Sequence, residues 1–151
     1  MLFRSEKFKA TRIAGHSGMG TTLAANLLAT SALLAALREL ITVDNYRIME
    51  ARALLLANAL QDLFARLRLD WHVSRVGART EFGFGPAPGN ATESESRMRP
   101  LLERVIHLSM LNRGYLVTPF HNMLLTSPVT TVEDIHGFVS TLDSVLKEIH
   151  P

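Results

Sequence analysis

A single uninterrupted helical pattern after Thr42 constrains the fold more than any other feature of this sequence. Apolar residues recur there at spacings of three and four, which is the period of one face of an α-helix. The opposite face carries Arg47, Arg52, Asp62 and Arg66. The pattern predicts an amphipathic helix of about 25 residues that covers a core with one face and shows the other to water. Its apolar positions are Tyr46, Met49, Ala53, Leu56, Leu60, Leu63 and Leu67.

The segments on either side of this pattern predict another helix and a β-hairpin. Residues 23–41 are rich in Ala and Leu, which favour helix, and the small residues on most sides indicate a helix buried all round. Residues 71–76 (WHVSRV) and 79–84 (RTEFGF) are β-prone and are separated by Gly77 and Ala78. We expect two antiparallel strands there. Residues 85–90 (GPAPGN) hold two prolines and two glycines and predict a loop.

A third helix is expected to end near Asn112 and Arg113, because Gly114 is a good helix terminator. Its start is open: Thr92 with Glu95 matches a capping box, whereas Pro100 prefers the first turn of a helix. The two signals cannot begin the same unbroken helix. The residues expected to face inward are Leu101, Leu102, Val105, Leu108 and either Met110 or Leu111.

The last part of the chain predicts two short strands and a helix. Residues 115–117 and 123–125 are β-prone on either side of the turn-forming sequence TPFHN. Thr131 opens the final helix, with Ile135, Phe138, Leu142 and Ile149 inward. The expected order is ααββαββα, which is an α/β chain with local α+β character and no internal repeat.

Composition describes one ordinary soluble domain and excludes several classes of protein. The 151 residues carry a net charge of +2, and the basic residues are interspersed with acidic ones, so we expect no nucleic-acid partner. No apolar run reaches the ~20 residues of a membrane span, and no hydrophobic run of a signal peptide follows the basic start. The absence of cysteine fits a reducing compartment, and we expect a cytoplasmic protein.

Motifs of several enzyme classes are missing from the sequence. No two of the six histidines are spaced i, i+4 on an expected helix, so no metal site is expected. The glycine-bearing segment GHSGMGTT lacks the lysine of a phosphate-binding Walker loop, and no serine lies in a nucleophile elbow. Hydrolase and nucleotidase functions are therefore excluded.

Four short motifs occur in a fixed order along the chain. They are GTTLAAN at 20–26, VGARTEF at 76–82, LNRGYLVTPFHNM at 111–123 and SPVTTVEDI at 127–135. In this order and spacing the chain resembles the pyridoxal-phosphate enzymes of aminotransferase class III, which include glutamate-semialdehyde aminomutases and β-amino-acid transaminases. The resemblance covers nearly all of residues 18–149.

The resemblance implies that the chain is the carboxy-terminal part of such an enzyme, with the tail of a type I pyridoxal-phosphate fold. Residues 1–22 would hold the cofactor-phosphate loop, 23–69 the helical tail of the large domain and the interdomain helix, and 70–151 the small α/β domain. The cofactor implied is pyridoxal 5'-phosphate, the partners are a second copy of the chain and the missing large domain, and the substrates are an amino acid and a keto acid or semialdehyde.

The lysine that forms the Schiff base with the cofactor is not found where the family has it. In the family this lysine lies two to three dozen residues before the GT motif, in a glycine-rich stretch. Lys7 and Lys9 fall too near Thr22, and no glycines surround them. No catalytic residue is therefore assigned, and the chain is expected to be an enzyme fragment without activity of its own.

Gly20, Thr21 and Thr22 are the expected cofactor-binding residues. The resemblance implies that Thr22 binds the cofactor phosphate in the neighbouring subunit. Small residues leading into a helix N-terminus expose N–H groups and a positive dipole, which independently suit a phosphate. The alternative is that Thr21 or Thr22 only caps the helix.

Four residues are candidates for binding substrate. Arg113 lies where the resemblance implies contact with a substrate carboxylate, and a guanidinium suits that group; alternatively it only complements the helix dipole. Arg79 is the other candidate for binding the substrate carboxylate; alternatively it faces solvent or forms a salt bridge with Glu81. His121 and Asn122 are implied to line the substrate pocket, although a lone loop histidine is more often a surface residue.

Two functions remain open at this level. The first is that of an aminotransferase, active only when joined to a lysine-bearing domain. The second is that of a catalytically silent α/β domain that associates through the apolar face its missing large domain should cover.

Overall fold

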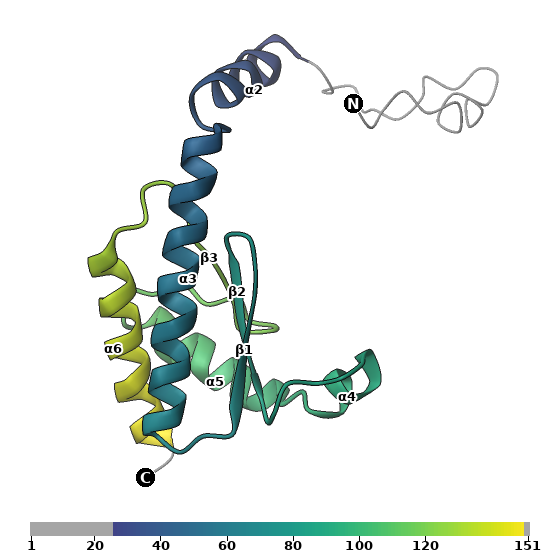
Figure 1. Cartoon of the computed structure of the whole chain (residues 1–151), viewed down its shortest axis with the longest axis vertical. Coiled ribbons are helices and arrows are strands. Elements are labelled where there is room, and N and C mark those ends of the chain that lie inside the picture. Colours follow the sequence, from purple (N-terminus) through teal and green to yellow (C-terminus); the bar gives the residue numbers. More distant parts are fainter. Residues whose placement is uncertain (1–25, 150–151) are drawn as a thin grey trace, which may run out of the picture. The chain divides into compact units, whose positions relative to one another are not determined.

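The computed structural model describes residues 26–149, which fall into two units that meet between Leu40 and Ile41 in the sequence (Figure 1). Helix α2 (Leu27–Glu39) lies in the first unit and begins at Asn26, whose side chain accepts a hydrogen bond from the Ala29 N–H at 2.9 Å. The expected helix is confirmed, but its expected burial on all sides is not found. None of its residues is buried, because the described part of this unit holds no second element for the helix to pack on.

The long amphipathic helix is confirmed as α3 (Val43–Arg66). Thr42 caps it by accepting a hydrogen bond from the Asn45 N–H at 3.2 Å. The buried face begins only at Ala53, and Tyr46 is 50% exposed against expectation. Figure 1 shows the reason: the first turns of α3 extend beyond the sheet and α6, so neither of these described elements of the same unit covers them. The buried residues of α3 are Ala53, Leu56, Ala57, Leu60, Leu63 and Phe64.

A three-stranded antiparallel sheet packs against α3, with the order β1-β2-β3. Strands β1 (Trp71–Val76) and β2 (Arg79–Phe84) form the expected hairpin, and β3 (Met123–Leu125) adds to β2. The hairpin turn contains Gly77 at φ 57°, a conformation that glycine adopts at little cost. Alternation along β2 buries Thr80, Phe82 and Phe84 and leaves the intervening residues on the other face.

The expected third helix is in fact two helices, α4 (Ala91–Ser96) and α5 (Pro100–Leu111). The expected capping box of Thr92 and Glu95 is wrong. Asn90 caps α4 by accepting a hydrogen bond from the Glu93 N–H, and the Glu93 carboxylate accepts one from the Gly89 N–H, both at 2.9 Å. Pro100 then starts α5. The region therefore contains two helix starts, and only the one expected at Pro100 is confirmed.

The inward face of α5 also differs from the expected one. Leu101 is 77% exposed and Leu108 is 49% exposed, whereas Ile106, Met110 and Glu103 are buried. Apolar residues occupy more than one side of α5, so periodicity alone does not select the side that packs on α6. Leu102 and Val105, which were also expected to face inward, are partly buried.

Residues 115–117 do not form the expected strand, and the observed order is ααββααβα. The backbone N–H of Tyr115 donates to the Met110 carbonyl at 2.9 Å and so closes the end of α5, where Gly114 has φ 88°. The Thr118 N–H donates to the Met123 carbonyl at 3.4 Å across a tight turn. Because these backbone groups are satisfied locally, the segment has no ladder to join.

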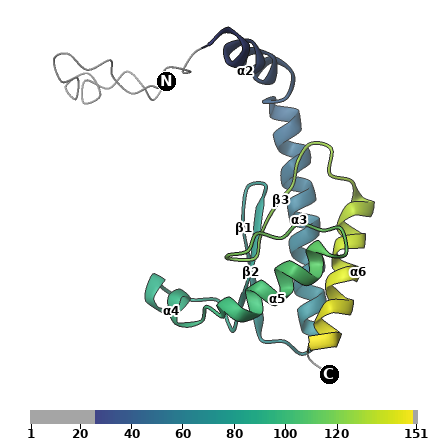
Figure 2. The ribbon, with the colours of Figure 1, turned by 180° about the vertical axis from the view of Figure 1, so that it is seen from behind.

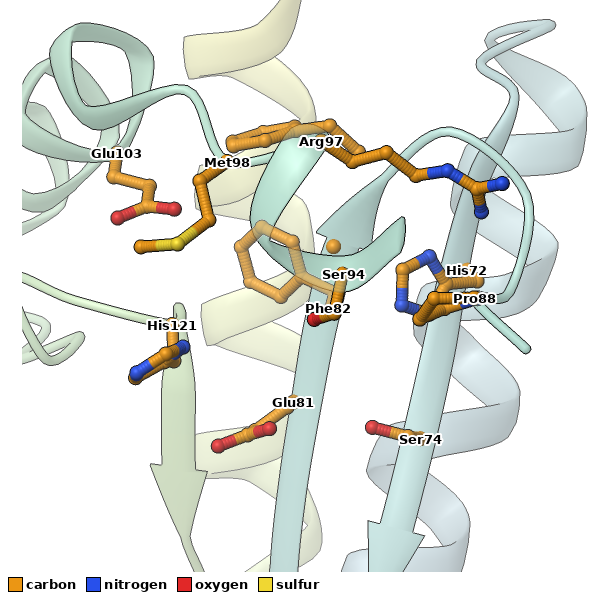
Figure 3. Close-up of a pocket in the computed structure, with 12 residues that line it drawn as sticks. His72, Ser74, Glu81, Phe82, Pro88, Ser94, Arg97, Met98, Glu103 and His121 are labelled. Carbon is orange, nitrogen blue, oxygen red and sulfur yellow. The ribbon is translucent and has the colours of Figure 1, made fainter. Parts of the chain in front are cut away.

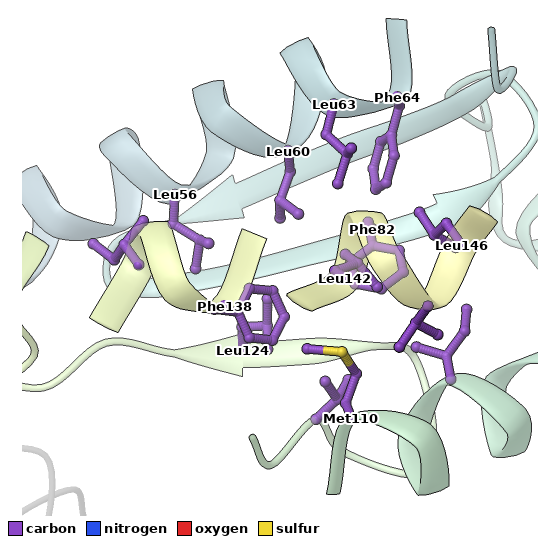
Figure 4. Packing of buried hydrophobic residues seen from close by; sticks show 14 of the residues in the cluster. Leu56, Leu60, Leu63, Phe64, Phe82, Met110, Leu124, Phe138, Leu142 and Leu146 are labelled. Carbon is purple, nitrogen blue, oxygen red and sulfur yellow. The ribbon is translucent and has the colours of Figure 1, made fainter. Parts of the chain in front are cut away.

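Helix α6 (Val132–Ile149) completes the core. The Asp134 N–H donates to the Thr131 hydroxyl at 3.0 Å and the Thr131 N–H donates to the Asp134 carboxylate at 2.8 Å, so Thr131 opens the helix as expected. Figure 2 shows α3 and α6 side by side with α5 lying across them, and Figure 4 shows the apolar side chains that meet between these helices and the sheet. No described helix is long and apolar enough to cross a membrane.

Candidate functional site

The turn between residues 118 and 122 carries two of the candidate substrate residues. The Thr118 hydroxyl donates to the Phe120 carbonyl at 2.6 Å and accepts a hydrogen bond from the Met123 N–H at 2.9 Å, which closes the turn. His121 and Asn122 both have positive φ, 60° and 42°. Asn and His enter this region more readily than most residues, which explains their place in a turn this tight.

The two turn residues have opposite environments. Asn122 is 1% exposed, and its Nδ2 donates to the Phe82 carbonyl at 3.2 Å, so it anchors the turn to β2. The Asn122 Oδ1 is buried without a hydrogen-bond partner among the described residues. His121 is exposed and faces a pocket. Of the two residues, His121 is therefore the one positioned to meet a ligand.

The pocket that His121 faces has a volume of about 70 Å³ and lies over the face of the sheet that does not contact the core. Strands β1 and β2 form its floor, where His72 pairs with Gly83 and Ser74 with Glu81. The segment from α4 to the start of α5 supplies the opposite wall (Figure 3). The residues that line the pocket are His72, Ser74, Glu81, Phe82, Gly83, Phe84, Pro88, Ser94, Arg97, Met98, Glu103 and His121.

The His72 ring is held in place on the pocket floor. Its Nδ1 is 2.9 Å from the Gly85 carbonyl oxygen. A Cβ added to Gly83 would lie 2.5 Å from the His72 Cε1, so the ring lies directly on the Gly83 backbone. Only a glycine leaves room for this arrangement.

Arg79 and Glu81 lie two residues apart on β2 and therefore on the same face of the sheet, where they form one of the expected alternatives, an ion pair. The Arg79 Nε donates to the Glu81 Oε1 at 3.0 Å, and the Nη2 contacts the same oxygen. Glu81 in turn lines the pocket. Arg79 therefore lies next to the pocket, with its charge already paired.

Arg113 is paired as well, at the other end of the core. Its Nη2 donates to both carboxylate oxygens of Glu148 at 2.8 Å, and its Nη1 donates to the Ser109 carbonyl at 3.1 Å. These bonds join the end of α5 to α6 and complement the α5 dipole. The pocket residues do not include Arg113 or Arg79, so the structure does not bring the two arginines together with His121 in one cavity.

The expected cofactor-phosphate residues and the question of a metal site remain to be placed. Gly20, Thr21 and Thr22 lie outside the described residues. Between residues 26 and 149, no three His, Asp or Glu side chains lie together as metal ligands would.

Sequence reasoning missed Glu103, the buried carboxylate of the pocket. A signal for it existed: Glu103 lies three residues before Ile106 and seven before Met110, which is the spacing of one helix face. Had that face been chosen as the inward one, a carboxylate would have been expected inside the fold.

Comparison with known structures connects this arrangement to a family. A glutamate-1-semialdehyde aminomutase from Pseudomonas aeruginosa PAO1, solved in complex with PMP, superposes with a TM-score of 0.82 and 41% sequence identity over 91% of this chain. The chain is similar to the carboxy-terminal part of class III pyridoxal-phosphate-dependent aminotransferases. It spans 31% of the length of that aminomutase. Comparisons with protein-family models and with curated proteins give no match.

Two further class III aminotransferases share the fold at lower identity. A β-phenylalanine aminotransferase from Variovorax paradoxus gives a TM-score of 0.76 and 21% identity over 92% of this chain and 31% of its own. An omega-transaminase from Sphaerobacter thermophilus gives 0.75 and 18% over 84% and 29%. The resemblance and the type I fold expected from the four motifs are confirmed by the match to the 41% identical aminomutase.

Proposed function

We propose that this chain is the carboxy-terminal part of a pyridoxal-phosphate-dependent aminotransferase or aminomutase that acts on an amino acid and a keto acid or semialdehyde. The observation that supports this is the 41% identity with the aminomutase at a TM-score of 0.82. When bound, the cofactor supplies an electron sink for the carbon that carries the amino group. The working enzyme is proposed to be a cytoplasmic homodimer in which the remaining large domain is present.

The second part of the proposal is that the chain lacks the lysine that bonds to the cofactor aldehyde and is inactive alone. Lys147 is the only lysine in residues 26–149, and its Nζ lies 3.0 Å from the Asp143 carboxylate on the surface of α6. Lys7 and Lys9 lie outside the described residues, in a sequence without the glycines of the family motif. No catalytic step is therefore assigned to the described residues.

The chain's own contribution is proposed to be binding. Gly20, Thr21 and Thr22 would hold the cofactor phosphate of the partner subunit through hydroxyl and backbone donors. Arg113 and Arg79 are each paired with a carboxylate, so a substrate carboxylate would take the place of Glu148 or Glu81 rather than add a new charge pair.

The turn residues have separate proposed parts in substrate binding. His121 would contact the substrate directly because it is exposed, whereas the buried Asn122 would fix the turn that carries it.

Cofactor labelling tests the missing lysine. The purified chain is mixed with pyridoxal phosphate, treated with borohydride and analysed by mass spectrometry after proteolysis, with the full-length Pseudomonas aminomutase as the positive control. We expect one lysine of the control to be labelled stoichiometrically. In this chain we expect no lysine to be labelled stoichiometrically. Full labelling of one lysine here, or keto-acid formation from an amino donor by the chain alone, would contradict the proposal.

A chimera tests the binding role. This chain replaces the matching segment of the aminomutase, and the chimera is expected to form a dimer that retains cofactor. Thr22→Ala should weaken cofactor retention about ten- to a hundredfold, the value of a hydrogen bond to a charged group, while Thr22→Ser should retain it. If both variants retain cofactor equally, Thr22 is only a helix cap.

The chimera also tests Arg113. Arg113→Ala should raise the KM for the substrate whose carboxylate Arg113 binds and leave cofactor affinity unchanged. The lost contact would stabilise the bound substrate and the transition state equally, so its removal affects KM. Arg66→Ala, which removes another surface ion pair, is the matched control. Equal effects of the two variants would assign Arg113 to stability alone.

A further inference from the structure

Glu103 is a largely buried residue whose carboxylate has no partner among the described residues. Its side chain is at the start of α5, and the residue is 6% exposed. Between residues 26 and 149, no other group makes a hydrogen bond or ion pair with this carboxylate. Glutamates are almost never buried unless they are paired, because an unpaired buried charge is costly. The Glu103 carboxylate oxygens are not among the side-chain atoms that are shielded completely from solvent, so they open into the pocket, and a partner for this charge would come from there.

The one cation among the pocket residues is engaged elsewhere. The Arg97 Nη1 donates to the Pro86 carbonyl, and the Nη2 lies 3.6 Å from the Glu93 carboxylate. Figure 3 shows the Arg97 guanidinium on the His72 side of the pocket, with Glu103 and Met98 at the opposite end. Arg97 thus leaves the charge of Glu103 uncompensated.

The other polar groups of the pocket are acceptors or hydroxyls. Glu81 is a second carboxylate, already paired with Arg79, and Ser74 and Ser94 supply hydroxyl groups. His121 lies on the same side of the pocket as Glu103 in Figure 3 and offers an imidazole nitrogen. This set suits a positively charged group with several N–H donors better than it suits an anion.

We infer that this pocket binds the primary ammonium group of a small amine, with the Glu103 carboxylate as its principal partner. An ammonium carries three donors and the charge that Glu103 lacks. The cavity of about 70 Å³ exceeds the about 10–15 Å³ that one water molecule requires on the same measure, so it admits the ammonium and a short alkyl stem. The inference does not depend on the proposed aminotransferase function.

The amine can come from two sources, a free small molecule or a lysine side chain of another polypeptide segment. Ethylammonium represents the first source, and Nα-acetyl-lysine methylamide represents the second. A higher affinity for ethylammonium identifies a free amine as the ligand. A higher affinity for the lysine derivative identifies a protein side chain, because its longer stem and backbone would also be contacted.

Histidine NMR signals provide the measurement on the intact 151-residue chain. His72 and His121 line the pocket, whereas His136 lies exposed on α6 and is the internal control. Ethylammonium chloride should shift the Cε1–H signals of His72 and His121 with saturation at about millimolar concentration, the range that a ligand of this size reaches. The His136 signal should not follow. Sodium chloride at equal ionic strength and ethanol, a neutral molecule of similar size, serve as blanks.

Two variants test the role of the carboxylate. Glu103→Gln keeps the shape and removes the charge, and it should weaken ethylammonium binding about tenfold or more. Glu133→Gln makes the same change on an exposed residue of α6 and should have no effect. Far-UV circular dichroism establishes that both variants are folded.

The wild-type titration also stands without the variants. Shifts that do not saturate, that ethanol or sodium chloride reproduces, or that persist unchanged in a folded Glu103→Gln variant would overturn the inference, and the pocket would then hold water only.

Discussion

Gly137 gives the sharpest test of how α6 packs. It lies within α6, and a Cβ added to it would be 2.2 Å from the Tyr115 hydroxyl oxygen and 3.5 Å from the Tyr115 Cζ. The Tyr115 ring is held edge-on against Phe138, with ring centroids 5.7 Å apart. Glycine is therefore needed at this position because the tyrosine hydroxyl occupies the space of a side chain.

The expected effect of Gly137→Ala is the difference between two terms. Alanine stabilises a helix interior by about 1 kcal/mol relative to glycine. Overpacking a fitted site costs about 1–3 kcal/mol, and here it would displace a ring whose edge-on contact contributes about 1 kcal/mol. We expect Gly137→Ala to lower the free energy of unfolding by about 1 kcal/mol in total.

Tyr115→Phe should reverse the sign of that effect. Without the hydroxyl the nearest remaining atom is the ring carbon at 3.5 Å, which is an ordinary contact. Gly137→Ala in this background should then stabilise the fold by about 1 kcal/mol, so the two positions couple by about 2 kcal/mol.

Urea unfolding of the four proteins measures this cycle, with Trp71 fluorescence and circular dichroism as two probes. Trp71 is the single tryptophan and contacts Phe64 and Phe82 in the core. If Gly137→Ala stabilises both backgrounds equally, the Tyr115 hydroxyl does not occupy the space beside Gly137.

Three further predictions concern the turn, the pocket floor and acid stability. Asn122→Ala should cost about 1–3 kcal/mol, because it removes the bond to β2 at a positive φ; Asn122→Gly in the same urea assay isolates the lost bond. Gly83→Ala should displace the His72 ring and cost about 1–3 kcal/mol, and an unshifted His72 NMR signal would contradict this. The backbone N–H of Thr131, and then its hydroxyl, lower the pKa of Asp134. Because the folded-state pKa lies below the unfolded one, this stabilisation is present above the unfolded-state pKa and is lost as pH falls through the folded-state pKa. The stability difference between wild type and Asp134→Asn should shrink accordingly, and a difference independent of pH would refute the assignment.

The sequence predicted the elements whose signals are local and agree with one another. The spacing in α3, the β-prone pair flanking Gly77 and the cap at Thr131 each recur in the structure at the expected place. The ion pair of Arg79 and Glu81 was one of the alternatives that strand alternation left open.

The failures arise where two signals compete or where tertiary contacts decide. Thr92 and Pro100 competed for one helix start, and the chain uses Asn90 and Pro100 for two. The strand expected at 115–117 was lost because a helix end and a tight turn took its backbone hydrogen bonds. The inward position of Glu103 was missed because a glutamate is expected in a buried position only when an ion-pair or hydrogen-bond partner for it is known.

The short helix α4 has a consequence for how the pocket exchanges its contents. It has six residues, and none of them is buried. A segment held by so little apolar contact opens with a small free energy, far below that of the whole domain. Its amides should exchange with deuterium long before those of α3 or α5. Since Ser94 lines the pocket, we expect a local opening of α4 to widen the pocket while the core remains folded.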